Sequence, residues 1–265
     1  MLSDMGDRSA IQWTEATWNP TTGCDRTSPG CENCYALTLA ARLKRMGQPK
    51  YQEDGDPKTS GPGFKLSVHD DALDIPVRWR AGRHIFVNSM SDLFHPEVPD
   101  EFIGRVLDVA RRTPQHTYQV LTKRSKRLAT IAPAFEWPSN VWMGVSIESD
   151  KYTFRARHLA EVQASVRFLS CEPLLGSLDS LDLDRIDWVI VGGESGRSAR
   201  SLDLGWVRDI RDRCKERSID LFIKQLGTAW SLEHGHGRTH GGDIDQWPAD
   251  LRIRQMPDDL KAAIA

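Results

Sequence analysis

The chain has 265 residues, a net charge of −2 and 39% hydrophobic residues. This length suits one large domain or two small ones, and the apolar fraction is sufficient for a buried core. No apolar run reaches the roughly 18 residues of a membrane span, so the composition argues against a membrane protein. The near-neutral charge neither demands nor excludes a nucleic-acid partner, because a local basic patch can exist within it.

The five cysteines bear on the cellular compartment and on the chemistry. The N-terminal residues 1–13 lack the basic-then-apolar pattern of a secretory signal, so we expect a cytoplasmic protein with reduced thiols. In that compartment clustered cysteines indicate metal or redox chemistry more often than disulfides.

The first predicted strand, 12–19, is followed by a polar loop that carries three of the cysteines. Cys24, Cys31 and Cys34 have the spacing C-x6-C-x2-C. A helix is predicted at 35–47. The segment 52–63 is rich in glycine, proline and charge, and it is predicted to be a mobile loop.

From residue 83 onward, short apolar runs alternate with amphipathic helical patterns. The runs are nearly continuous, as is typical of parallel strands that are buried on both faces. The predicted strands are 84–90, 117–123, 141–147, 166–172, 187–193 and 220–226. The predicted helices are 99–112, with Asp100 as its N-cap, 152–162 and 204–217.

About seven βα units predict either a doubly wound sheet or a complete or partial (β/α) barrel of the TIM type. We favour the barrel because polar residues follow the carboxyl ends of most strands, and in a barrel these ends converge on one mouth. These residues are Asn88, Ser89, Asp92, Thr122, Lys123, Arg124, Ser146, Glu148, Cys171, Glu172, Glu194, Lys224 and Gln225. We predict one barrel domain over 1–265, with a C-terminal extension at 228–265 packed on or near it.

The cysteine loop is the strongest candidate for a metal site. Structural zinc sites take four ligands, commonly as two close pairs, whereas this loop offers one pair and a single cysteine. His95, the histidines after residue 233 or Cys171 would have to supply the fourth ligand. A [4Fe–4S] cluster held by three thiolates would instead keep one iron open. We therefore predict a catalytic cluster on Cys24, Cys31 and Cys34, with zinc as the alternative.

Several stretches resemble a known family: TWNPTTGC, CENCYA, VNSMSDLFH, VLTKR, MGVSIES, FLSCEPLLG, VIVGGESG and FIKQLG. Over residues 9–257 the chain resembles the phage Gp37/Gp68 family (DUF5131) and, more distantly, the radical S-adenosylmethionine enzymes. The common spacing in those enzymes is C-x3-C-x2-C, and Asn33 stands where an aromatic residue is usual. The resemblance implies S-adenosylmethionine bound at the open iron, its cleavage to a 5′-deoxyadenosyl radical, and an electron donor.

Other candidate site residues follow from position alone. Gly192 and Gly193 allow close approach of a ligand, and the carboxylate of Glu194 could accept from an amine or a ribose hydroxyl. Ser146 and Glu148 are weaker candidates of the same kind. The predicted catalytic residues are Asp92, His95, Lys123 and Glu194.

Each of these catalytic assignments has a structural alternative. Asp92 could cap a turn, and His95 could be an ordinary loop histidine. Lys123 could contact phosphate as part of the basic run 123–127, or it could lie in a solvated helix start. Cys171 and Cys214 are predicted to be core thiols.

Two classes of function remain open at this point, beside a third option of a cluster-bearing photolyase-like or electron-transfer protein. The first is a radical S-adenosylmethionine-type iron–sulfur enzyme that acts on DNA or RNA, either as a modifying enzyme or in repair that resembles photoproduct lyases. The second is a non-catalytic protein that binds nucleic acid or a partner and holds a structural zinc or cluster.

Overall fold

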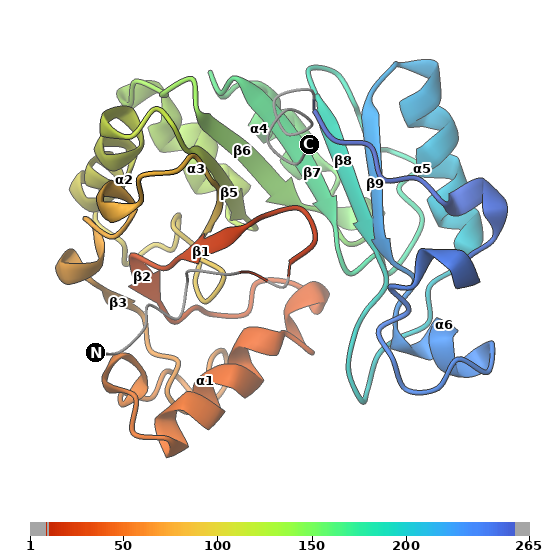
Figure 1. Ribbon diagram of the computed structural model, residues 1–265, viewed down its shortest axis with the longest axis horizontal. Helices are drawn as coiled ribbons and strands as arrows, with labels where there is room; N and C mark the ends of the chain where they lie inside the picture. Colours follow the sequence, from red (N-terminus) through yellow and green to blue (C-terminus); the bar gives the residue numbers. More distant parts are fainter. Residues whose placement is uncertain (1–8, 10, 258–265) are drawn as a thin grey trace. The chain divides into compact units, whose positions relative to one another are not determined.

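The computed structural model describes residue 9 and residues 11–257. Residues 1–8, where no secretory signal was predicted, and the last eight residues of the predicted C-terminal extension lie outside this range. Within it, seven strands form one sheet in the order β1-β4-β5-β6-β7-β8-β9 (Figure 1). Their bounds are β1 Ala16–Trp18, β4 His84–Val87, β5 Thr117–Thr122, β6 Val141–Ser146, β7 Val166–Cys171, β8 Trp188–Gly192 and β9 Asp220–Gln225.

The strand order distinguishes between the two predicted architectures. Each strand of the sheet lies next to the one that precedes it in the chain, with no reversal of direction. A doubly wound sheet would reverse its order at a switch point, whereas a (β/α) barrel would not. The pairings β1–β4, β4–β5, β7–β8 and β8–β9 are parallel. The order ends at β1 and β9, so the fold is a partial (β/α) barrel, as predicted.

The chain divides into two compact units. The first comprises Met1–Gly144 with Val162–Ser165, and the second comprises Val145–Glu161 with Val166–Ala265. In the described part of the chain, no helix is both long enough and apolar enough to span a bilayer.

The first unit contains helices α1 Tyr35–Arg45, α2 Asp100–Arg112 and α3 Ser125–Ile131. Helix α2 buries the apolar face that its sequence predicted, including Phe102 and Val106. The predicted N-cap at Asp100 was wrong, since Pro99 occupies that position with an extended backbone and Asp100 is the first helical residue. The Asp100 carboxylate still lies in the first turn, where it complements the helix dipole, and it pairs with Arg127 of α3.

A small second sheet forms the base of the cysteine loop. Strands β2 Thr21–Thr22 and β3 Ser67–Val68 pair antiparallel. The segment 52–63 between them contains no helix or strand, in agreement with its loop composition. The pairing of β2 with β3 therefore joins the chain before the cysteines to the chain after the 52–63 loop.

The second unit contains helices α4 Phe154–Ala160, α5 Leu204–Glu216 and α6 Thr228–Glu233. Every residue of β8 is buried, as expected of a strand covered on both faces. Cys171 and Cys214 are both buried, so the prediction that they are core thiols is confirmed. Residues after α6 return to β9: Ile223 donates its amide to Ile253, and Gln255 donates its amide to Leu221.

Candidate metal centre

Gly23 fixes the chain immediately before the first cysteine. Its amide donates to the carbonyl of Met90 at 3.0 Å, and its own carbonyl accepts from Ser91 Oγ at 2.6 Å. Its φ of +85° is in the left-handed region, and a Cβ at this position would lie 2.1 Å from the Lys65 carbonyl oxygen. Glycine is therefore required here, and the strain-free turn brings Cys24 to the carboxyl end of β4.

Cys31 and Cys34 are placed by two consecutive helical turns. Cys31 ends a short 3-10 helix, Pro29–Cys31, and Cys34 is the N-cap of α1, with its amide donating to the Cys31 carbonyl at 3.4 Å. Cys24 and Cys34 both pack against the apolar cluster under α1 that includes Ala40 and Met90. The three thiols are half-buried and not in disulfides. Burial is the largest cause of the raised pKa at Cys24 and at Cys34, and the charge of Cys31 adds to the shift at each.

The surroundings shift the pKa values of the three thiols in different directions. Burial, followed by the Asp92 carboxylate, raises the pKa of Cys24 to about 12. Burial also raises the pKa of Cys34. Burial acts in the same sense on Cys31, but the Lys123 ammonium and the hydrogen bonds from Thr27 and Ser28 outweigh it, and the pKa of Cys31 is lowered. Cys31 is thus the thiol most ready to lose its proton to a metal.

Asp92 organises the residues that follow β4 and β5. These strands are neighbours and parallel, so their carboxyl ends meet at one edge. Asp92 Oδ1 accepts from Thr122 Oγ1 at 2.6 Å, and Oδ2 accepts from the Lys123 amide at 3.1 Å. Arg124 Nε lies 3.9 Å from Oδ2, while Arg124 Nη2 is 3.8 Å from Cys24 Sγ. Asp92 therefore holds the segment that presents Arg124 to the sulfur.

His95 meets Asp25, the residue after Cys24. His95 Nδ1 accepts the amide of Glu97 at 3.2 Å, so Nε2 carries the proton that is shared with Asp25 Oδ2 at 3.0 Å. Asp25 Oδ1 also accepts from Thr59 Oγ1 at 2.6 Å. Burial works to raise the pKa of Asp25, but the bonds from Thr59 and His95 outweigh it and lower that pKa. The sequence predicted His95 as a site residue but missed Asp25, whose only signal was its position beside a cysteine.

The basic run 123–127 divides into two kinds of residue. Arg127 donates to the carbonyls of His95 and Val98, and Arg124 is committed to the cysteine loop. The charge of Lys123 acts to lower the pKa of Cys31 and of Cys34, and Lys126 is exposed. Within this run Lys126 thus stays exposed and makes no ion pair among the described residues, while the charge of Lys123 also acts on the cysteine loop.

Within residues 9 and 11–257, no three His, Cys, Asp or Glu side chains form a ready-made site for a metal ion. The chemistry of the donors nevertheless suits an iron–sulfur cluster: three half-buried thiols on one loop, with an arginine and a lysine beside them to offset negative charge.

The candidate cofactor residues of the second unit are engaged in contacts of their own. Arg155 Nη1 donates to Glu148 Oε2 at 2.9 Å and to the Ser146 carbonyl at 2.7 Å, and both members of this ion pair are buried. Glu194 accepts from the amide and the guanidinium of Arg200, each at 2.9 Å. A ligand would have to share both carboxylates with these arginines.

The two candidate glycines also have close neighbours. A Cβ at Gly192 would lie 2.4 Å from Glu172 Oε1, and one at Gly193 would lie 2.4 Å from the Leu226 carbonyl oxygen. Their lack of a side chain is therefore used by packing inside this unit. The predicted roles of Ser146, Glu148, Gly192, Gly193 and Glu194 in cofactor binding stay predictions.

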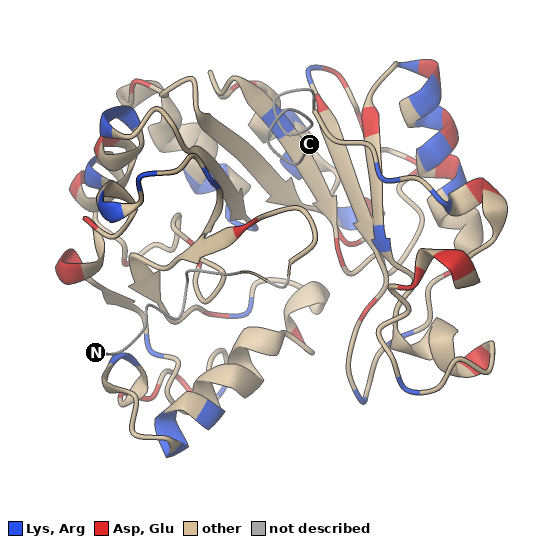
Figure 2. Cartoon of the chain, viewed as in Figure 1, with Lys and Arg blue, Asp and Glu red and all other residues tan. Residues whose placement is uncertain are grey.

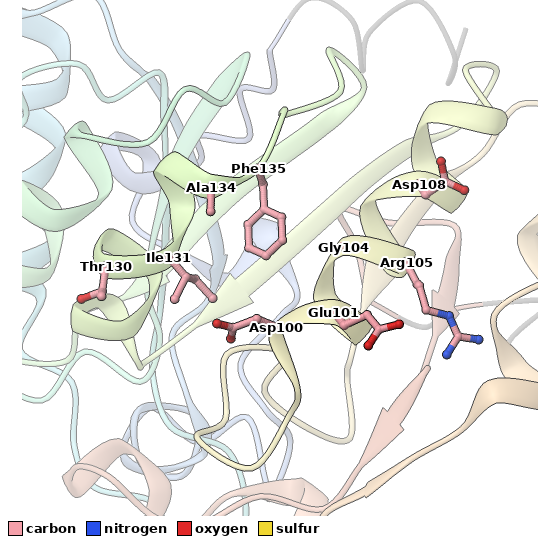
Figure 3. Close-up of a pocket in the computed structure, with 9 residues that line it drawn as sticks. All are labelled: Asp100, Glu101, Gly104, Arg105, Asp108, Thr130, Ile131, Ala134 and Phe135. Carbon is pink, nitrogen blue, oxygen red and sulfur yellow. The ribbon is translucent and has the colours of Figure 1, made fainter.

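One pocket lies in the first unit but away from the cysteine loop. It is lined by residues of α2 and by the segment from Thr130 to Phe135 (Figure 3). Asp100 and Glu101 line it at the start of α2, so it carries acidic groups and none of the thiols. It is therefore separate from the metal centre.

A sequence comparison identifies the family. The model of a family described as "Protein of unknown function (DUF5131)" matches residues 8–249. A search of curated proteins gives no match.

Solved structures of spore photoproduct lyase are similar in fold. A single-residue variant of that lyase has a TM-score of 0.51 at 13% identity, covering 82% of this chain and 78% of the lyase chain. A second variant has a TM-score of 0.46 at 15% identity, and the match covers 74% of this chain and 59% of the lyase chain. A double variant with bound AdoMet and dinucleoside spore photoproduct has a TM-score of 0.46 at 14% identity, covering 78% and 63%. The present chain thus spans about three fifths of the first-matched lyase chain.

Proposed function

We propose that this chain, which belongs to the DUF5131 family, is an iron–sulfur enzyme of the radical S-adenosylmethionine type. Cys24, Cys31 and Cys34 would hold a [4Fe–4S] cluster. The observation that carries the proposal is that one loop carries three half-buried free thiols and meets the carboxyl end of β4 next to Cys24, in a partial (β/α) barrel. The fold shared with a lyase at a TM-score of 0.51 supports the architecture alone.

When bound, such a cluster supplies one electron and an open iron position for S-adenosylmethionine. The chain's own residues would prepare the site. Lys123 favours the thiolate of Cys31, and Arg124 donates to the sulfur of Cys24. Asp92 would join the segments that follow β4 and β5, and the His95–Asp25 pair would hold the cysteine loop to the segment after β4. In this account Asp92 and His95 act as positioning residues, while Lys123 faces the ligand.

The proposed substrate class is nucleic acid, and it is the finer part of the proposal. Its support in the structure is the exposed Lys126, with the half-buried Lys123 near it at the end of β5. A gel-shift titration with single- and double-stranded oligonucleotides would test it, since phosphate contacts weaken steeply with salt. Binding that is absent at low salt would contradict a nucleic-acid substrate and leave the cluster proposal intact.

The test of the proposed function is anaerobic purification with metal, sulfide and absorbance analysis. We expect about four iron and four sulfide per chain and a broad visible absorbance. Addition of S-adenosylmethionine to the reduced protein should change its EPR spectrum, because the open iron gains a ligand. Stoichiometric zinc without iron would contradict the proposal and favour the structural alternative, as would a cluster whose spectrum ignores S-adenosylmethionine.

A further inference from the structure

Helix α1 begins at the residue after Cys34 and presents an unusual outward face. Its inward face buries Ala36, Ala40 and Leu43. Outward, the exposed fractions of Tyr35, Leu39 and Met46 are 56%, 37% and 59%. In the described part of the chain only three other large apolar side chains are exposed: Val68, Val77 and Leu232. Half of these six exposed residues therefore belong to this helix and its C-cap residue, Met46.

The outward residues form a single stripe. Tyr35, Leu39, Arg42 and Met46 are separated by four, three and four positions, and this spacing places them on one side of a helix with 3.6 residues per turn. Tyr35 is held at the start of the stripe because its hydroxyl donates to the Ser89 carbonyl at 2.5 Å. We call Tyr35, Leu39, Arg42, Arg45 and Met46 the α1 face.

The α1 face is also positively charged. Helix α1 contains no acidic residue, and Figure 2 shows its basic residues gathered near its C-terminal end. Lys44 is neutralised by Asp54 at 2.5 Å. Arg42 and Arg45 are exposed and make no ion pair within residues 9 and 11–257. The face therefore carries two uncompensated positive charges on a chain whose net charge is −2.

This combination fits a protein partner better than a nucleic acid. Single-stranded nucleic acid is bound by successive aromatic rings, whereas two of the three large apolar residues here are aliphatic. Aromatic, methionine and arginine side chains are enriched at protein interfaces, and positive charge favours an acidic partner. A stripe of this length suits a small, transient contact.

The position of the α1 face indicates which kind of acidic protein would bind there. Helix α1 packs its inward side on the apolar cluster that Cys24 and Cys34 contact, and its first residue adjoins Cys34. The Tyr35 end of the α1 face adjoins Cys34, so a carrier that covers this end would lie beside the cysteine loop, and electron transfer falls steeply with distance. We propose that the α1 face docks a small acidic one-electron carrier protein, which gives one electron to the cluster; the carrier is oxidised, the cluster is reduced, and no bond forms or breaks. This inference rests on the proposed function.

The experiment uses photoreduced flavodoxin as the probe and iron-loaded chain under anaerobic conditions. Stopped-flow absorbance would follow reduction of the cluster at increasing salt, and calorimetry would measure binding. The variants are Arg42→Glu and Arg45→Glu, separately and together. Arg80→Glu is the matched control, because Arg80 is exposed and makes no ion pair among the described residues.

We expect the wild-type rate to fall with salt and the double variant to react about tenfold slower, with weaker binding in proportion. Arg80→Glu should change the rate less than about twofold, and dithionite should reduce all variants alike. This inference would be overturned if the double variant reacted like the wild type. It would also be overturned if dithionite reduced the cluster but flavodoxin never did. Neither outcome would contradict the proposed function. A wild-type chain without reducible iron would instead overturn the proposed function. A dimer in sedimentation velocity that Leu39→Glu dissociates would assign the face to self-association, and so contradict a carrier.

Discussion

Arg124 reaches Cys24 across a hundred residues of sequence, with Nη2 3.8 Å from Sγ and 3.2 Å from the Asp25 carbonyl oxygen. The guanidinium is largely buried, as is Asp92, whose carboxylate lies 3.9 Å from Nε. Of the three cysteine sulfurs, only that of Cys24 receives an arginine donor in the described structure. A hydrogen bond from a cation to one ligand sulfur stabilises negative charge on it.

The first prediction concerns this contact. Arg124→Met removes the donor and a positive charge, so the oxidised cluster should become relatively more stable and its reduction potential should fall. An EPR-monitored redox titration would measure the potential. Lys126→Met is the control, because Lys126 is exposed on the same segment. Equal potentials in the wild type and Arg124→Met would mean that the contact does not influence the cluster.

The second prediction concerns the three candidate ligands. Replacing Cys24, Cys31 or Cys34 singly with alanine should lower bound iron at least about tenfold after identical reconstitution, since each removes a thiolate ligand. Cys214→Ala is the control: it removes a buried thiol that packs on α5, and iron content should be unchanged. Retention of iron by any of the three variants would remove that cysteine from the ligand set.

The third prediction uses two glycines that share a left-handed backbone. At Gly23 a methyl group would also collide with the backbone of Lys65, whereas at Gly47 it would meet nothing within 4 Å. We expect Gly47→Ala to cost about 1 kcal/mol and Gly23→Ala to cost roughly 2–4 kcal/mol of unfolding free energy. Urea unfolding monitored by circular dichroism would measure both. Similar losses in the two variants would contradict the close approach of the Gly23 turn to Lys65.

The fourth prediction concerns pH. Burial lowers the pKa of His116 despite opposing hydrogen bonds to the carbonyls of Pro76 and Trp79. In the unfolded chain the pKa is about 6.5, so between that value and the lower folded pKa only the unfolded state takes up the proton. The contribution to stability is therefore full above about pH 6.5 and is lost as the pH falls below it.

Urea unfolding at about pH 8 and pH 5.5 would test this sign. The wild type should lose stability between the two values, and His116→Gln should lose less. His69, whose pKa burial also lowers, would retain part of the slope in that variant. A His116→Gln variant with the full wild-type slope would show that His116 does not titrate differently on unfolding.

Much of the architecture was predictable because buried parallel strands have a strong local signal. Six apolar runs from residue 84 onward became strands within a few residues of the expected bounds. The first strand was overestimated: only Ala16–Trp18 pairs with β4, and just before it Glu15 contacts His84 through both its amide and its carboxylate. Helix α3 was missed because its seven residues are short and rich in charge at the start.

The candidate site was predictable only in part. The cysteines were visible as a spacing, but the partners of Asp92 and Asp25 come from segments 30 to 70 positions away. A single sequence has no signal for such long-range hydrogen bonds. The arginine partners of Glu148 and Glu194 lie only seven and six positions further along the chain, but this spacing matches no helix or strand period and so gave no signal either.

The 52–63 loop has a consequence for anyone who engineers this protein. Thr59 donates to the Asp25 carboxylate, and the Arg26 amide donates to the Thr59 carbonyl, so two bonds tie the loop to residues beside Cys24. Its composition invites truncation to aid crystallisation or expression. Trimming the loop would remove contacts that hold the residues next to Cys24. If a shortened chain failed to take up metal, that result would therefore say nothing about the full-length chain.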